Sequence, residues 1–101
     1  MGKRARDYET MLVERLCDSE YAVDYLNAIL AEGIGDTGAF LAGLRRVAKA
    51  RGIGLTRLSE DAGLGRQALY RSLSTDGNPE LTTLTRVLSE LGLRLAVRSA
   101  A

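Results

Sequence analysis

Hydrophobic residues recur every three or four positions along most of the chain, which is the spacing of one face of an α-helix. The pattern predicts helices over residues 7–17, 18–32, 36–51, 55–62, 66–74 and 82–91. The apolar side chains expected to face the core are Tyr8, Met11, Leu12 and Leu16; Ala22, Tyr25, Leu26, Ile29 and Leu30; Phe40, Leu41, Leu44, Val47 and Ala48; Leu58, Ala62, Leu69 and Leu73; and Leu84, Val87, Leu88 and Leu91.

Polar residues and glycines mark the predicted helix ends. A side-chain oxygen at the N-cap accepts a hydrogen bond from one of the first free amides of a helix. The expected N-caps are Asp18 or Ser19, Asp36 or Thr37, and Thr82. Glycine ends helices because it tolerates a left-handed backbone. The expected terminators are Gly33, Gly35, Gly52, Gly54 and Gly92.

Residues 93–98 have a different pattern. Leu93, Leu95 and Val97 alternate with Arg94, Ala96 and Arg98, as in a half-buried β-strand. No other segment predicts a strand, and a lone strand needs a partner, for which a second copy of the chain is the simplest choice. We therefore expect an all-α fold of five to six helices with a short C-terminal β-strand.

The chain of 101 residues is long enough for one domain with one modest core. We expect residues 1–6 to form a flexible basic tail and residues 7–101 to form a single helical domain. Within that domain, the sequence separates acidic N-terminal helices (residues 7–35), a second helical part (residues 36–92) and the strand.

Charge is segregated along the chain although the total is only +1. Residues 1–6 carry three basic residues and no acid, hence +3; residues 7–36 carry eight acids and one Arg, hence −7; and residues 37–101 carry ten basic and five acidic residues, hence +5. Two interpretations remain open: the charges simply keep exposed faces solvated, or an acidic face serves one partner and a basic face serves a polyanion.

The residue types present exclude several kinds of site. The chain has no His and a single Cys, Cys17, which rules out Ser-His and Cys-His nucleophilic sites and zinc sites built from His or several Cys. The Gly-Ile-Gly stretches at residues 33–35 and 52–54 lack the length and the Lys or third Gly of phosphate-binding loops. We expect no enzyme activity, no catalytic residue, no metal and no cofactor.

The sequence also indicates a compartment. No stretch approaches the roughly 18 consecutive apolar residues of a membrane helix. Residues 1–7 are basic and then acidic, without the apolar stretch of a signal peptide. Cys17 cannot form an intramolecular disulfide and suits a reducing environment. We expect a cytoplasmic protein with no membrane contact.

Residues 55–73 fit a helix-turn-helix. Leu58 and Ala62 share one face of the first helix, Gly63 occupies the turn, and Leu64 fills the angle between the helices. The inner face of the second helix combines small and large residues, which are Ala68, Leu69, Ser72 and Leu73.

The outer face of the second helix fits DNA recognition. Its residues are Arg66, Gln67, Tyr70, Arg71 and Ser74. Arg forms two hydrogen bonds with guanine, and Gln two with adenine, in the major groove. Arg66 and Gln67 lie in the first turn, which enters the groove deepest. Gly65 leaves room for a phosphate at the helix N-terminus. The candidates for flanking phosphate contacts are Thr56, Arg57 and Asn78.

Several stretches of the chain resemble the addiction-module antidote family, which consists of HigA-like antitoxins with a Cro/C1-type (XRE, lambda-repressor-like) helix-turn-helix. They are GLGRQALYRSLS at residues 63–74, GNPEL at residues 77–81 and VLSELGLRL at residues 87–95, with AVDYLNA at residues 22–28 and LRRVAKARG at residues 44–52 similar to the family's N-terminal half. The likeness covers about residues 8–98. It marks residues 36–92 as the DNA-binding core.

The resemblance implies a homodimeric transcriptional regulator that binds a palindromic operator in double-stranded DNA, neutralises a RelE/ParE-type toxin and represses its own operon. It places the recognition helix at Arg66, Gln67, Tyr70 and Arg71. Gly65 departs from the Ser that is common there in the family, which removes one side-chain phosphate contact. The acidic segment 7–36 would suit a basic partner, and RelE-type toxins are basic.

Three functions remain open on the sequence. The first is an autoregulatory antitoxin, and the second is a stand-alone helix-turn-helix repressor without a toxin partner. The third is a helical dimerisation module that binds no DNA, in which Arg66 and Gln67 are merely solvated. A neighbouring gene for a toxin-like protein separates the first two, and salt-dependent DNA binding separates the third from both.

Overall fold

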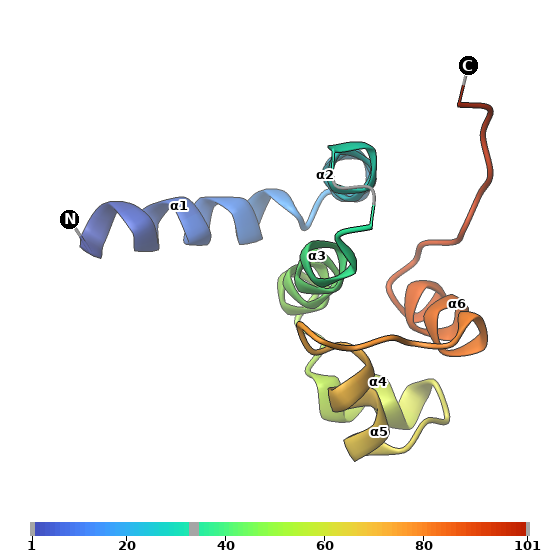
Figure 1. Cartoon of the computed structure of the whole chain (residues 1–101). Coiled ribbons are helices and arrows are strands. Elements are labelled where there is room, and N and C mark those ends of the chain that lie inside the picture. Colours follow the sequence, from blue (N-terminus) through green and yellow to red (C-terminus); the bar gives the residue numbers. More distant parts are fainter. Residues whose placement is uncertain (1, 33–34, 101) are drawn as a thin grey trace.

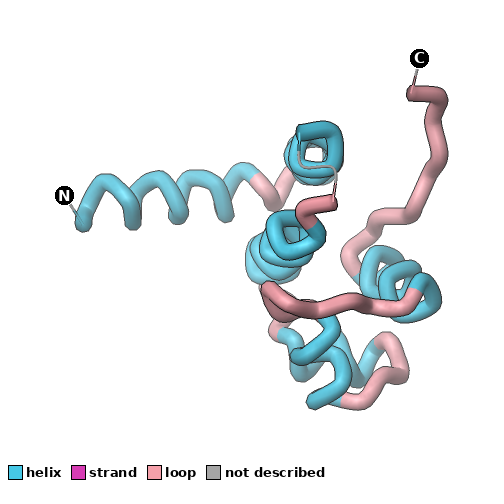
Figure 2. The backbone as a smooth tube through the Cα atoms, in the orientation of Figure 1, coloured by secondary structure: helices cyan, strands magenta, loops and turns pink. Residues whose placement is uncertain are grey.

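The computed structural model describes residues 2–32 and 35–100, with side chains from residue 7 onward. These residues form six helices, which are α1 (Gly2–Arg15), α2 (Ser19–Glu32), α3 (Thr37–Ala50), α4 (Leu55–Asp61), α5 (Arg66–Ser72) and α6 (Leu81–Glu90). They contain no β-strand (Figure 2). The expectation of an all-α fold is confirmed. None of the helices described is long and apolar enough to cross a membrane.

Helix α3 lies at the centre of the molecule (Figure 1). Helices α1 and α2 both pack against it, while α4 packs against α5 and α6. The pair α4–α5 lies at the end of the molecule opposite α2. The core is formed mainly by leucines from all six helices, including Leu16, Leu26, Leu41, Leu44, Leu58, Leu69, Leu73 and Leu88.

The core confirms most of the predicted apolar faces. Those of α3 and α6 are buried or half-buried as expected. Four predicted inward positions are wrong: Leu30 is 50% exposed, Met11 is 49% exposed and Tyr8 is 70% exposed, and Ala68 is exposed. The N-terminal part of α1 extends away from the other helices (Figure 1), so apolar side chains there have no neighbouring helix to pack against.

Helix α1 is held to the body near its C-terminal end. Leu12 and Leu16 are buried there. Arg46 of α3 forms an ion pair with Glu9 (Nε to Oε1, 3.1 Å) and donates a hydrogen bond to the Tyr25 hydroxyl at 3.1 Å. The hydrogen bond to Tyr25 is the main reason that the pKa of Arg46 is raised above its ordinary value. Through its bonds to Glu9 and Tyr25, the guanidinium links α1, α2 and α3.

Two of the predicted N-caps are confirmed. Asp18 accepts a hydrogen bond from the Glu20 amide at 2.9 Å, and Asp36 accepts one from the Ala39 amide at 3.1 Å. The prediction for Thr82 is wrong, because the extended residue Glu80 is the N-cap of α6 and has no side-chain capping bond. The backbone carbonyl of Glu80 already accepts from Leu84, so the helix starts before Thr82. Gly33 lies outside the described residues.

Both predicted terminal segments differ from expectation. Residues 2–6 continue α1, where a flexible tail was predicted. Lys, Arg and Ala are good helix formers, and no Gly or Pro interrupts residues 3–6. At the other end, residues 93–98 are not a β-strand. Gly92, with φ +75, ends α6. Residues 93–98 then have no neighbouring strand in the described part of the chain, and a β-strand forms only beside another strand.

Candidate nucleic-acid interface

Helices α4 and α5 are joined by a tight turn at residues 62–65. Gly63 has a φ of +69, which an L side chain rarely adopts. Its amide bonds to the Glu60 carbonyl at 3.1 Å, and the next amide, of Leu64, bonds to the Ser59 carbonyl at 2.8 Å. These two bonds form a Schellman motif that ends α4 and turns the chain into α5. The prediction that Gly63 occupies the turn with a positive φ is confirmed.

Helix α5 is fixed to the core by its inner face. Leu69 and Leu73 are each 1% exposed, and Leu58 of α4 is fully buried. Ser59 is buried as well, and its hydroxyl donates to the Thr56 carbonyl at 2.6 Å, so its polar group is satisfied. This packing determines which side of α5 faces outward.

The outward side of α5 brings four of the predicted residues together. Arg66, Gln67, Tyr70 and Arg71 are all exposed and line one shallow depression on the surface. The Arg66 guanidinium carbon lies 5.9 Å from the centre of the Tyr70 ring, within the range of a cation–π contact. The depression is therefore lined by two guanidinium groups, one amide and one phenol, all of them hydrogen-bond donors.

The other five predicted residues lie outside this depression. Arg57 forms an ion pair with Asp61 one turn later (Nε to Oδ2, 3.5 Å), and the Ser74 hydroxyl donates to the Arg71 carbonyl at 2.8 Å. Gly65 is the N-cap of α5 without a side-chain capping bond, Asn78 is exposed and Thr56 is half-buried. The predicted DNA contacts of these five residues remain a prediction.

Sequence reasoning missed a residue that supports α5 from behind. The Arg45 Nη1 atom, on α3, donates a hydrogen bond to the carbonyl oxygen of Leu73, which is the C-cap of α5. A cation at this end of a helix also interacts favourably with the helix dipole. The two residues are 28 positions apart, so no local pattern indicates the contact.

We expect Arg45→Ala to destabilise the fold by about 1.5–3 kcal/mol, the usual range for a hydrogen bond to a charged group. The variant leaves the Leu73 carbonyl without this donor. Urea unfolding followed by circular dichroism measures the change. Lys49→Ala is the matched control, since Lys49 is an exposed cation of the same helix. Equal stability of the two variants would contradict a supporting role for Arg45.

The fold and the site define an all-α protein in which two short helices, joined by a glycine turn, present a basic polar face at one end of the molecule (Figure 1). The chain belongs to the family described as "Probable addiction module antidote protein", whose model matches residues 8–99. The resemblance to the addiction-module antidote family noted in the sequence is thereby confirmed.

A relative from Haemophilus influenzae (strain ATCC 51907 / DSM 11121 / KW20 / Rd), described as an uncharacterized protein, is 32% identical over 100 residues. The alignment covers 99% of this chain and 97% of the relative. No solved structure shows a significant match to the chain. Family membership implies a non-enzymatic antidote role in a toxin–antitoxin module, and therefore a toxin partner.

Proposed function

We propose that this protein is the antitoxin of a type II toxin–antitoxin module and represses its own operon by binding DNA through α5. The observation that carries the DNA-binding part is the outward row of α5, formed by Arg66, Gln67, Tyr70 and Arg71. The antitoxin part rests on family membership.

The chemistry of α5 suits the major groove of DNA. The helix, RQALYRS, contains no acidic residue, so its exposed face repels no phosphate. Arg66 and Gln67 stand in its first turn, where side chains of a recognition helix contact base edges. Each bidentate contact to a base is worth about 1–3 kcal/mol of discrimination. Leu69 and Leu73 hold this face in a fixed orientation.

A recognition helix of seven residues contacts only a few base pairs, and a homodimer doubles the contact. We infer that two copies bind a palindromic operator whose half-sites are about 34 Å apart, one turn of DNA. Phosphate contacts make such binding salt-dependent, so the logarithm of the binding constant should fall linearly with the logarithm of the salt concentration.

The toxin would bind a different part of the surface. The acids of residues 7–36 are mostly exposed; they include Glu14, Asp18, Glu20, Asp24, Glu32 and Asp36. This acidic part fits a basic protein such as a RelE/ParE-type toxin. Helix α2 lies at the opposite end of the molecule from α5 (Figure 1), so DNA and toxin do not compete for one face.

Co-expression with the product of the adjacent gene tests the antitoxin role. We expect a complex that elutes as one peak in size-exclusion chromatography and that weakens as salt is raised, because opposite charges attract across the interface. An unrelated basic protein of similar size is the control and should elute separately. If the neighbouring product also elutes separately, or if no toxin-like gene is adjacent, the stand-alone repressor is the correct alternative.

A further inference from the structure

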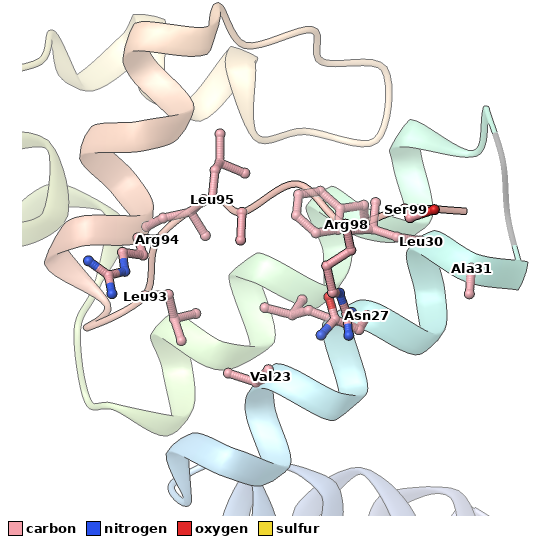
Figure 3. Close-up of a pocket in the computed structure, with 13 residues that line it drawn as sticks. Val23, Asn27, Leu30, Ala31, Leu93, Arg94, Leu95, Arg98 and Ser99 are labelled. Atoms are coloured by element: carbon pink, nitrogen blue, oxygen red, sulfur yellow. The ribbon is translucent and has the colours of Figure 1, made fainter. Parts of the chain in front are cut away.

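A groove of about 740 Å³ lies between α2 and the C-terminal segment, residues 93–99 (Figure 3). Its lining is largely apolar. Leu30 of α2 is 50% exposed, and Val23 and Leu95 are also exposed. Val97, between two residues that line the groove, is 99% exposed. Apolar side chains gathered on one face of a small protein are typical of an interaction surface.

The segment along one edge of this groove is basic, and the α2 row that contains the lining residue Asn27, along the other edge, continues into acidic residues that do not themselves line the groove. Arg94 and Arg98 line it from the C-terminal segment, and Figure 3 shows the Arg98 side chain directed toward Asn27 of α2. Glu20 and Asp24 belong to the same row of α2 as Asn27, at positions i, i+4 and i+7. Among the described residues, none of these four charged groups takes part in an ion pair.

The backbone between residues 94 and 98 also lacks a partner strand among residues 2–32 and 35–100. Within the part of the chain that the structure describes, residues 94–98 form no backbone–backbone hydrogen bond. None of residues 94–98 is a Pro, so each of these five residues carries an amide that can act as a donor. Between residues 94 and 98, exposed apolar side chains (Leu95 and Val97) therefore lie beside two guanidinium groups without an ion pair and beside backbone amides without a backbone hydrogen bond within the described chain.

We propose that this groove is the surface on which a second copy of the chain docks, with the basic segment of each copy lying along the acidic edge of α2 of the other. In a two-fold interface each copy supplies both a basic segment and an acidic edge of α2. The basic segment of each copy therefore meets the acidic edge of the other, and the exposed apolar side chains of both copies are covered at the same time. A foreign partner of one charge would match only one edge. The inference rests on the dimer of the proposed function and names its interface. It leaves α5 free for DNA, because no residue of α5 lines the groove. It leaves to the toxin the exposed acids outside this row of α2, such as Glu14 and Glu32.

The first test uses Val97→Asp, measured by size-exclusion chromatography with light scattering. Val97 is almost fully exposed in a single copy, so the variant should fold normally by circular dichroism. We expect the wild type to be a dimer and Val97→Asp to be a monomer at the same concentration. Leu81→Asp is the matched control, because Leu81 is an exposed apolar residue (67%) outside the groove, and it should remain dimeric.

The second test exchanges the charges. We expect Asp24→Arg and Arg98→Asp each to raise the dimer dissociation constant about tenfold or more, and the double variant to restore most of the loss, because the reversed pair attracts again. Analytical ultracentrifugation measures these constants. A merely structural role for either residue predicts additive losses instead of rescue.

The outcomes separate this inference from the proposed function. If the wild type and all groove variants are dimers, the interface lies elsewhere, and the inference fails while the dimeric repressor stands. If the wild type is monomeric at every concentration, both the inference and the proposed dimer are wrong. DNA binding is then tested separately, by the dependence of the DNA-binding constant on salt concentration. If the groove variants instead abolish only the complex with the adjacent gene product, the groove belongs to the toxin and the inference is wrong.

Discussion

Replacing Leu69 with alanine is expected to lower the free energy of unfolding by about 2–5 kcal/mol, the range found when a buried leucine is truncated. Leu69 is 1% exposed and belongs to the inner face of α5. Its truncation removes apolar contacts and leaves a cavity beneath the helix. Small domains are stable by only about 5–15 kcal/mol in total, so the variant should lose a large share of its stability, and its thermal midpoint should fall by about 4–8 °C for each kcal/mol lost.

Thermal and urea unfolding of the purified variant measure this loss. Leu81→Ala is the control, since Leu81 is 67% exposed, and its free energy of unfolding should change by no more than about 0.5 kcal/mol. If Leu69→Ala were as stable as the control, the Leu69 side chain would not be what holds α5 against the core. The burial of Leu69 would then not explain why the row of Arg66, Gln67, Tyr70 and Arg71 faces outward.

The second large effect concerns DNA affinity instead of stability. Gln67→Ala and Arg71→Ala are each expected to weaken operator binding by about 1–3 kcal/mol, or roughly 5- to 150-fold, if the side chain contacts a base. Both residues are exposed, so the unfolding midpoint should stay near that of the wild type. Electrophoretic mobility shift titrations at one fixed salt concentration give the affinities.

Arg86→Ala controls for the loss of charge, because Arg86 is an exposed cation on α6 outside the α5 depression. If Arg71 contacts a phosphate and no base, Arg71→Ala should weaken all sequences alike and reduce the salt slope by about one. Equal effects of Arg71→Ala and Arg86→Ala would mean that α5 has no special part in DNA binding.

Local patterns were sufficient for most of the fold. Helices α3 and α6 follow from apolar stripes that are regular over about two turns, and Asp36 is recognisable as a cap because a short acceptor directly precedes such a stripe. Gly63 was predictable in the same way, since a Gly between two short amphipathic helices indicates a turn with a positive φ. These features depend on residues close together in the sequence.

Features that depend on distant parts of the chain were not predictable. The apolar spacing of Tyr8 resembles that of a core residue, but its exposure depends on where α1 leaves the body of the protein. The alternation at residues 93–98 predicted a strand, yet a strand forms only beside another one. Arg45 looked like an ordinary surface cation of α3, and its contact with Leu73 exists only because the fold brings the end of α5 to it.

In the candidate site, too, some features were predictable from the local sequence and others were not. The outward row of α5 follows from helical periodicity once the inner face is known, and the structure brings its four members together. The flanking candidates came from residue type alone. For Arg57 and Ser74 the structure shows partners within the protein, Asp61 and the Arg71 carbonyl, which the sequence did not indicate.

The central claim is that α5 recognises DNA bases, and quantitative footprinting on the DNA upstream of the protein's own gene tests it most directly. We predict a protected palindromic site with half-sites about 34 Å apart, bound far more tightly by the wild type than unrelated DNA is. Gln67→Ala should lose this preference while remaining folded. Equal protection of upstream and unrelated DNA by the wild type, or an unchanged preference in Gln67→Ala, would contradict the claim.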